Sequence, residues 1–457
     1  MKRAILCGAL AVAAGGCATF EKQKGHDQVA ALVRERSGAT TGWGEGSPGA
    51  EQIAARVDAL LGGGLTLDGA VEIALLNSPA LQATYEELGV SQAEMIQAGL
   101  LSNPTLDIKL GFPLTPSTVN ELEIGLVQEL VELLMLPLRT KVAAEQFQAD
   151  ILRVSHEALQ AAAEAKKQLA AVQAEEQLLE ARRKALQAAE AAADLAHRQH
   201  RAGGITDLEL AERTVAHEQA RVEVAQVELS LAASRERLNR LLGLWGPRTE
   251  WKVRDALPGL PVEEVPLDRL ESMAIRRRLD LAVARHEVAM LARAADLART
   301  WRYFGRVEVG VDTHQDADGP RLLGPSLVLE LPVFDQRQAA IARLEAQQHR
   351  AERRLAALSV DARSEVREAR ARLLAARQLV LHLDANVLPL RRRVVEHSLR
   401  QYNGMQLGLY QLLEAKRAEL DSERDRLEAL REYWSWRFEL EKLVGGRIAP
   451  LAQEARR

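Results

Sequence analysis

The sequence contains a long internal repeat, in which two halves of the chain align with an offset of about 200 residues. Leu67-Asp68 falls on Leu267-Asp268, and a one-residue slip later puts Gly203 on Gly404. A repeat of this length indicates two copies of one structural unit, and it has to be interpreted before any single motif.

Each half predicts the same order of elements: helix, strand, loop, strand, long helix, tight turn, helix. Glycine and serine concentrate before the first half, and proline concentrates between the halves, which is typical of linkers. The predicted organisation is a signal peptide at 1–17, a flexible N-terminal linker at 18–65, a first repeat at 66–246, an inter-repeat linker at 247–266, a second repeat at 267–446 and a C-terminal tail at 447–457.

The composition is typical of long helices packed side by side. Aromatic residues are 4% of the chain, and charged residues of both signs are 27%. The formal net charge of -4 gives no basic surface, so nucleic acid is not expected as a partner.

The first residues predict export. Lys2 and Arg3 precede an apolar stretch at 5–14 that is too short to span a membrane. Gly15-Gly16-Cys17 resembles a lipoprotein signal, in which Cys17 becomes the lipidated first residue of the mature chain. The alternative is an ordinary secretory signal with an incidental cysteine. Cys7, the other cysteine, lies inside the signal, so no cysteine-based metal site is expected.

Four segments alternate between aliphatic and polar residues, which is the period of a β-strand. In the first half they are residues 106–112 and 121–126. In the second half they are residues 306–312 and 327–333, separated by a turn-forming loop at 314–324. The aliphatic positions include Leu106, Ile108, Leu110, Leu122, Ile124, Val307, Val309, Leu327 and Leu329, and the acidic positions between them are Asp107, Glu123, Glu308, Asp312 and Glu330.

A long helical segment follows each strand pair. Residues 138–200 contain no proline or glycine, which predicts a helix on the order of 90 Å. Leu152 and Leu159 are seven residues apart, and so are Leu179 and Leu186, a spacing that favours coiled-coil packing. Gly203-Gly204 in the first half and Asn403-Gly404 in the second half mark the turns between long helices.

The strand lengths and their two faces fit a membrane β-barrel with lipid outside and water inside. Eight strands from two chains would enclose a filled interior, whereas three chains would supply twelve strands and an aqueous lumen. The predicted fold is therefore mainly α, with an α-barrel of long coiled helices and a 12-stranded β-barrel in a trimer. The alternative is a small soluble sheet that caps a helical bundle.

This layout resembles the outer-membrane efflux proteins, the TolC-like outer membrane factors, from about residue 66 to 445. The resemblance implies a passive homotrimeric duct in the outer membrane of a Gram-negative bacterium, with a periplasmic adaptor and an inner-membrane pump as partners. The lipidated form resembles the branch that serves resistance-type pumps for metals or drugs. The matching segments are residues 77–81, 102–104, 278–281, 329–334, 402–405 and 412–415.

The resemblance also implies a gate at the helical tips, where a ring of acidic residues draws cations. Glu414 falls on one such position, and Gln411 falls where a second acid can stand. The other candidates for the gate or for adaptor contact are Asp207, Glu209, Gly203, Gly204 and Gly404. The alternative for the acids is an ordinary solvated helix face, and for the glycines a purely structural role in the turns.

No motif for catalysis, a cofactor or a metal is found in the sequence, because it lacks a glycine-rich phosphate loop, a nucleophile elbow and a zinc-binding helix. His197 and His200 lack a carboxylate or thiol that would complete a metal site. The main alternative function is a periplasmic adaptor or scaffold lipoprotein without a pore. A lipid-anchored hydrolase is the third hypothesis, and the absence of catalytic motifs argues against it.

Overall fold

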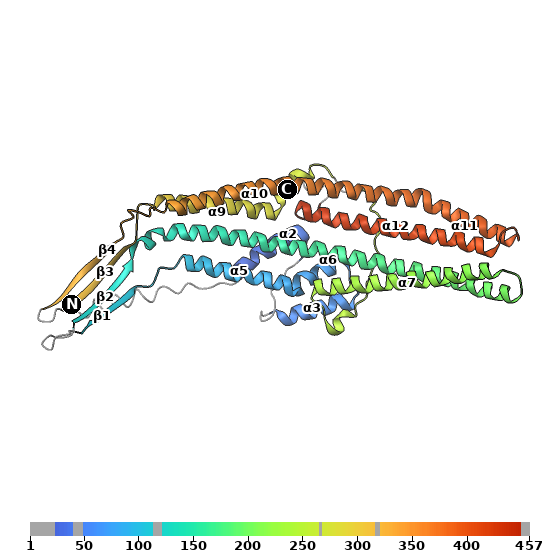
Figure 1. The fold of residues 1–457 in the computed structure, drawn as a ribbon, viewed down its shortest axis with the longest axis horizontal. Coiled ribbons are helices and arrows are strands. Elements are labelled where there is room, and N and C mark those ends of the chain that lie inside the picture. Colours follow the sequence, from blue (N-terminus) through green and yellow to red (C-terminus); the bar gives the residue numbers. More distant parts are fainter. Residues whose placement is uncertain (1–22, 40–48, 113–120, 265–266, 316–319, 449–457) are drawn as a thin grey trace. The chain divides into compact units, whose positions relative to one another are not determined.

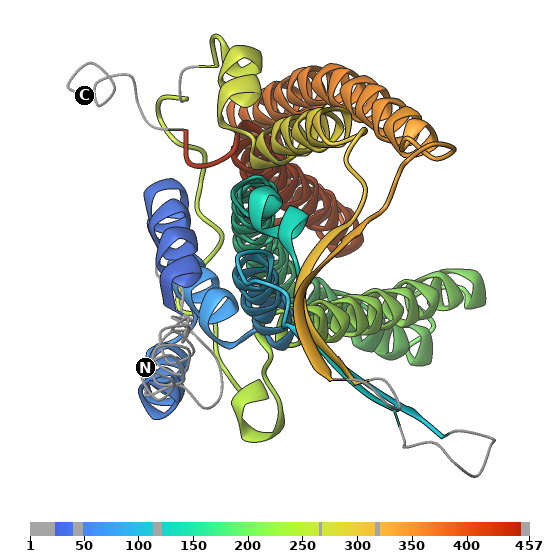
Figure 2. The same ribbon diagram turned by 90° about the vertical axis from the view of Figure 1, so that its left-hand side faces the viewer.

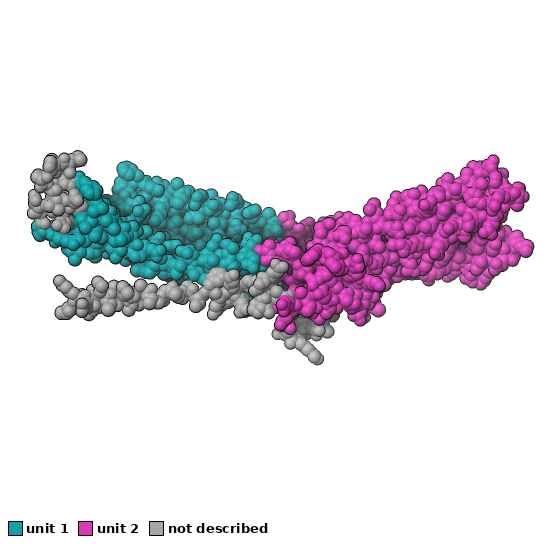
Figure 3. All heavy atoms as spheres, turned by 90° about the horizontal axis from the view of Figure 1, so that it is seen from below, with its two compact units in different colours: residues 1–29, 85–154, 280–358 teal, residues 30–84, 155–279, 359–457 magenta. Residues whose placement is uncertain are grey.

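The computed structural model describes residues 23–39, 49–112, 121–264, 267–315 and 320–448. Cys17 and the predicted signal peptide lie outside these residues. The chain divides into two compact units, coloured in Figure 3. Unit 1 comprises residues 1–29, 85–154 and 280–358, and unit 2 comprises residues 30–84, 155–279 and 359–457, so both sequence repeats contribute to each unit.

The two repeats have the same order of elements (Figure 1). The first repeat contains α4 (Leu67–Asn77), α5 (Pro79–Ala98), β1 (Thr105–Gly111), β2 (Glu121–Glu129), α6 (Leu130–Arg201) and α7 (Asp207–Leu242). After the short turn η2 (Gly246–Thr249), the second contains α8 (Leu270–Arg277), α9 (Leu279–Thr300), β3 (Val307–Gln315), β4 (Arg321–Leu329), α10 (Gln338–His382), η3 (Leu383–Val387), α11 (Leu388–Asn403) and α12 (Leu409–Val444).

Two helices, α2 (Gln23–Ser37) and α3 (Ala50–Gly62), occupy part of the segment for which the sequence predicts a flexible linker. Val29 and Val33 of α2 and Val57 of α3 are fully buried. The sequence predicts a linker here because the surrounding residues are rich in glycine and serine, and this composition hides the few valines that form the buried side of each helix. Within the segment, residues 23–37 and 50–62 are therefore ordered helix rather than linker.

The four strands form one antiparallel sheet in chain order, β1-β2-β3-β4. Figures 1 and 2 show the four strands lying side by side. β2 and β3 come from different repeats, and Ile124 lies opposite Thr313 in their register. The sheet therefore joins the two repeats inside unit 1, and its outer edges are β1 and β4.

Relative to the predicted bounds, β3 ends later, and β4 begins and ends earlier. Gln315 pairs with Arg321, so the hairpin extends into the residues predicted as a loop. At the other end, the Glu330 N–H donates to the Arg306 carbonyl over 2.9 Å, and Pro332 has no N–H with which to continue the ladder. The alternation of aliphatic residues continues past Leu329, but the hydrogen-bonded strand ends there.

The helices of unit 1 are joined by polar contacts. The Ser91 hydroxyl donates to the buried Asp150 carboxylate over 2.5 Å, which links α5 to α6. Glu145 of α6 lies 2.8 Å from His286 of α9 and also pairs with Arg293. The hydrogen bonds from His286 and Arg293 lower the pKa of Glu145.

Unit 2 contains two corresponding hydrophobic cores, one from each repeat. In both, a short helix packs against the end of a returning helix. The residues are Ala70, Ala74, Leu238 and Leu242 in the first repeat, and Leu270, Ala274, Leu440 and Val444 in the second.

Glycine ends the returning helix in both repeats. Gly243 has a φ of 66° and Gly445 a φ of 87°, a conformation that side chains other than glycine rarely adopt. A Cβ on Gly243 would overlap the Asn77 carbonyl oxygen, and one on Gly445 would lie 2.8 Å from the Arg277 carbonyl oxygen. The Asn77 amide donates to the Leu242 carbonyl over 2.8 Å. Asn77, which belongs to the segment 77–81 singled out in the sequence, therefore fixes the end of α7.

The helices α6 and α11 each contain a proline, and each proline lies at a position where its missing N–H does little harm. Pro137 lies near the start of α6, and Pro389 follows the π-helical turn η3. A π-turn absorbs the hydrogen bond that a proline cannot make. Among the described residues, no helix has both the length and the hydropathy needed to cross a membrane.

Candidate functional site

The register of the sheet separates the predicted aliphatic and acidic positions onto opposite faces. Cross-strand pairing puts one set in rows on the same face, namely Leu106, Ile108, Leu110, Leu122, Ile124, Val307, Val309, Leu327 and Leu329. The opposite face carries Asp107, Glu123, Glu308 and Asp312. Glu330 lies just beyond β4, where its carboxylate accepts a hydrogen bond from the Arg306 N–H over 3.0 Å.

The aliphatic face is not covered by helices of unit 1. Leu106, Ile108, Leu126, Val309 and Leu327 have exposed fractions between 44 and 62%. A folded chain rarely leaves an apolar patch of this kind open to water, and such a patch marks a contact with another protein or with a membrane.

The other face is rich in carboxylates. Asp107 and Asp312 both face Gly125 across the sheet, and a Cβ on this glycine would lie within 4 Å of the Cβ of either aspartate. Lys109 pairs with Glu123 over 3.3 Å. Acidic side chains outnumber basic ones on this face, so its field favours cations.

The first tip, the turn between α6 and α7, contains four of the predicted residues. Gly203 has a φ of 71°, which the turn requires, and Gly204 follows it. The Thr206 hydroxyl and the Glu209 carboxylate form a capping box at the start of α7, and these hydrogen bonds lower the pKa of Glu209. Asp207 lies 2.7 Å from His200.

The second tip, the turn between α11 and α12, has a different conformation. Gly404 has a negative φ, and Met405 has the positive φ of this turn. The Gln411 side chain accepts a hydrogen bond from the Gly408 N–H over 2.8 Å, which caps α12. Gln411 and Glu209 therefore cap the starts of α12 and α7. For Glu209, the three-residue spacing from Thr206 already indicates a capping box in the sequence.

Tyr410 joins the two tips to each other. Its hydroxyl donates to the Gln199 side chain over 2.7 Å, and the Arg213 guanidinium lies 4.3 Å from the centre of its ring. Burial raises the pKa of Tyr410. This contact between segments about 200 residues apart is not visible in the sequence pattern.

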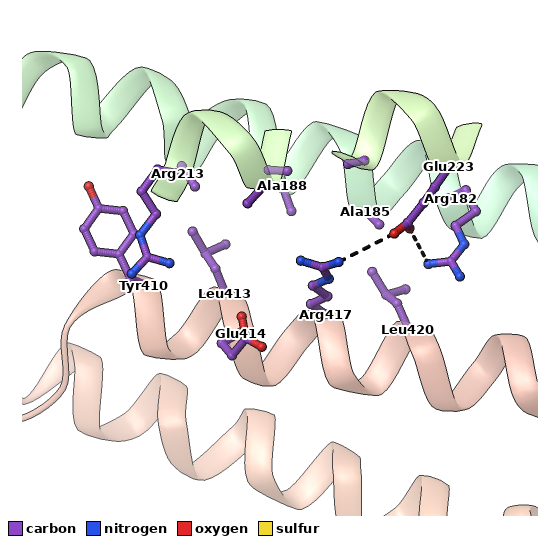
Figure 4. Close-up of a pocket in the computed structure, with 14 residues that line it drawn as sticks. Arg182, Ala185, Ala188, Arg213, Glu223, Tyr410, Leu413, Glu414, Arg417 and Leu420 are labelled. Carbon is purple, nitrogen blue, oxygen red and sulfur yellow. Dashed lines mark ion pairs between the residues drawn. The ribbon is translucent and has the colours of Figure 1, made fainter. Parts of the chain in front are cut away.

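A groove lies between the first hairpin and α12 (Figure 4). Glu223 of α7 pairs with Arg182 of α6 over 2.9 Å and with Arg417 of α12 over 3.5 Å. Arg182 also pairs with Asp421 over 3.0 Å. These ion pairs connect three helices and hold the second hairpin against the first.

Glu414 lines the same groove beside Leu413, and it is exposed. It makes no ion pair with any residue that the structure describes. A carboxylate in this position is available to a cation or to a partner. Of the predicted tip residues, Glu414 alone lines this groove, whereas the others lie in the turns and at the helix starts.

The family model described as outer membrane efflux protein matches residues 70–244. The matched residues cover most of the first repeat and less than half of the chain. A comparison with curated proteins finds no match.

Solved outer-membrane proteins have the same fold. The CmeC outer membrane channel of Campylobacter jejuni has a TM-score of 0.72 at 13% identity and covers 85% of this chain and 88% of its own. VceC of Vibrio cholerae has a TM-score of 0.68 at 16% identity, covering 84% and 97%. The open MtrE outer membrane channel of Neisseria gonorrhoeae has a TM-score of 0.67 at 17% identity, covering 83% and 89%.

These comparisons confirm the predicted family and fold class. The chain is mainly helical, with four antiparallel strands, and has the architecture of TolC-like channels. The matched family and the structural neighbours are efflux proteins and channels of the outer membrane, which supports an outer-membrane efflux channel.

Proposed function

We propose that three copies of this efflux protein close their sheets into one barrel of twelve strands and form a passive export duct. The uncovered aliphatic face of the sheet carries the proposal, because it needs a lipid environment while the carboxylate face needs water. A barrel also pairs the outer edges of β1 and β4, which an open sheet in a membrane leaves without partners.

The duct works in a tripartite system with a periplasmic adaptor and an inner-membrane pump. The tips are the periplasmic entrance and adaptor contact, where Glu414 faces the path of the exported solute. The resemblance to the branch that serves resistance-type pumps supports metal ions or drugs as cargo. The acidic face of the sheet favours cations among them. Energy comes from the pump, because the chain holds no nucleotide motif.

Lipidation of Cys17 adds a second attachment to the outer membrane. The apolar segment before Gly15-Gly16-Cys17 supports this modification. An acyl anchor keeps the N-terminus of the mature chain at the membrane surface.

Planar-bilayer recording of the purified full-length protein tests the proposal. We expect a detergent-solubilised complex with the mass of three chains and stepwise single-channel currents that prefer cations. A monomer without conductance would overturn the channel and would favour a scaffold without a pore.

A further inference from the structure

The outward face of α7 carries an apolar stripe that nothing in the described chain covers. Leu208, Val215, Val222 and Leu229 recur at intervals of seven residues, and their exposed fractions lie between 48 and 73%. A seven-residue repeat is the seam of a coiled coil, whose partner is another helix. The exposed face of α6 differs, because Arg183, Lys184 and Glu190 make it polar.

A second uncovered apolar patch lies on α11. Leu390 is 56% exposed and Val394 is 47% exposed, whereas the other side of α11 packs along α12. Figure 1 shows α7 and α11 along opposite edges of the tip end of unit 2. The two patches therefore cannot meet within one chain.

The two patches have opposite charge. The segment 207–229 of α7 contains six acidic residues and two arginines, and α11 contains four arginines and one glutamate. Arg391 and Arg393 on α11 are exposed, and neither pairs with any residue that the structure describes. An acidic helix and a basic helix with matching apolar residues favour each other over contacts with their own kind.

The two patches also lie at the same level along the rods. Arg392 of α11 lies 3.9 Å from Glu419 and 4.0 Å from Glu423 of α12. Between these glutamates, Asp421 of α12 pairs with Arg182, which pairs in turn with Glu223 of α7. Arg392 and Glu223 therefore lie at the same height along the helix axes. The apolar residues next to them, Leu390 and Val394 on α11 and Val222 on α7, lie at that height too.

We propose that α11 of one copy packs against α7 of the next, with Leu390 and Val394 seated against Val222. Rotation about an axis parallel to the rods preserves their level, so the matching residues meet when copies close into a ring. The proposal rests on the assembly of several copies in the proposed function, and it identifies the helices that seal the periplasmic wall.

Disulfide cross-linking tests this interface in the purified full-length protein. A chain carrying both Val222→Cys and Val394→Cys is oxidised and run on a non-reducing gel. We expect covalent species of two and three chains, with cross-linking at least tenfold above that of either single variant. The parent chain reports any contribution of Cys17.

Two control pairs separate a specific contact from random collision. Leu208→Cys with Leu390→Cys places the thiols at different levels, and Arg183→Cys with Val394→Cys uses the polar face of α6. Both pairs are expected to stay at background. Equal cross-linking in all pairs would overturn the interface. A conducting trimer without a 222–394 bond would overturn it too, and would leave the channel intact.

Discussion

Replacing Leu327 with arginine is expected to remove the protein from the outer membrane. Leu327 lies on the aliphatic face of β4, opposite Val309, and is 62% exposed in the chain. The substitution therefore disturbs little packing within the chain. A charge on the lipid side of a barrel strand costs about 2 kcal/mol at intermediate depth. In the proposed trimer, the three copies of the substitution raise this cost to about 6 kcal/mol.

The neighbouring residue provides a matched control. Val328 is 55% exposed, belongs to the same strand and lies opposite Glu308 on the carboxylate face. Val328→Arg gains an acidic neighbour and stays in water, so we expect near-normal amounts of membrane-embedded trimer. Fractionation followed by heat-modifiable gel mobility measures both variants. Loss of assembly in both, or in neither, would contradict the assignment of the two faces.

Replacing Glu264 with glutamine is expected to lower the free energy of unfolding by about 3 kcal/mol. Glu264 lies in the segment between the repeats, and its side chain is only 13% exposed. It pairs with Arg377 over 3.2 Å and with Arg437, and it accepts a hydrogen bond from the Tyr433 hydroxyl over 2.7 Å. Its removal leaves two largely buried guanidinium groups without that carboxylate.

The adjacent Glu263 is the control for this prediction. Glu263 is exposed and makes no ion pair with the part of the chain that the structure describes. Glu263→Gln is expected to change the stability by less than about 0.5 kcal/mol. Thermal unfolding followed by circular dichroism in one detergent compares the two variants with the parent. An equal melting temperature for Glu264→Gln and the parent would show that the buried cluster does not hold the segment.

The sheet and the long helices were predictable because their patterns are local. Alternation along β1 places Leu106, Ile108 and Leu110 on one face whatever the neighbouring strand is. The ends of β4 were less predictable, because Leu331 and Val333 continue the alternation after the strand ends at Leu329. The end of β4 depends on where the neighbouring strand β3 stops pairing with it, and the alternation within β4 alone does not contain this information.

The contacts that organise the tips and the middle of the chain depend on residues far apart in sequence. Tyr410 meets Gln199, and Glu264 meets Arg437, only after the two repeats have packed. The composition of residues 247–266 indicates a linker, although the structure buries Trp251 and Leu257 among the helices of unit 2. The capping roles of Glu209 and Gln411 could have been predicted from their spacing to the residue that precedes each helix. The resemblance to acidic gate positions instead implies a role for both residues at the gate or in adaptor contact.

The central claim is that the carboxylate face of the sheet lines a pore made by three chains. Single-channel recording of Asp312→Cys during addition of a water-soluble cationic thiol reagent tests it most directly. The register puts Asp312 opposite Gly125 on the carboxylate face and Val311 opposite Leu126 on the aliphatic face. We predict that the current through one Asp312→Cys channel falls in three equal steps, and that Val311→Cys and the parent do not respond. A current that is unchanged in Asp312→Cys, or that falls equally in Val311→Cys, would contradict the account.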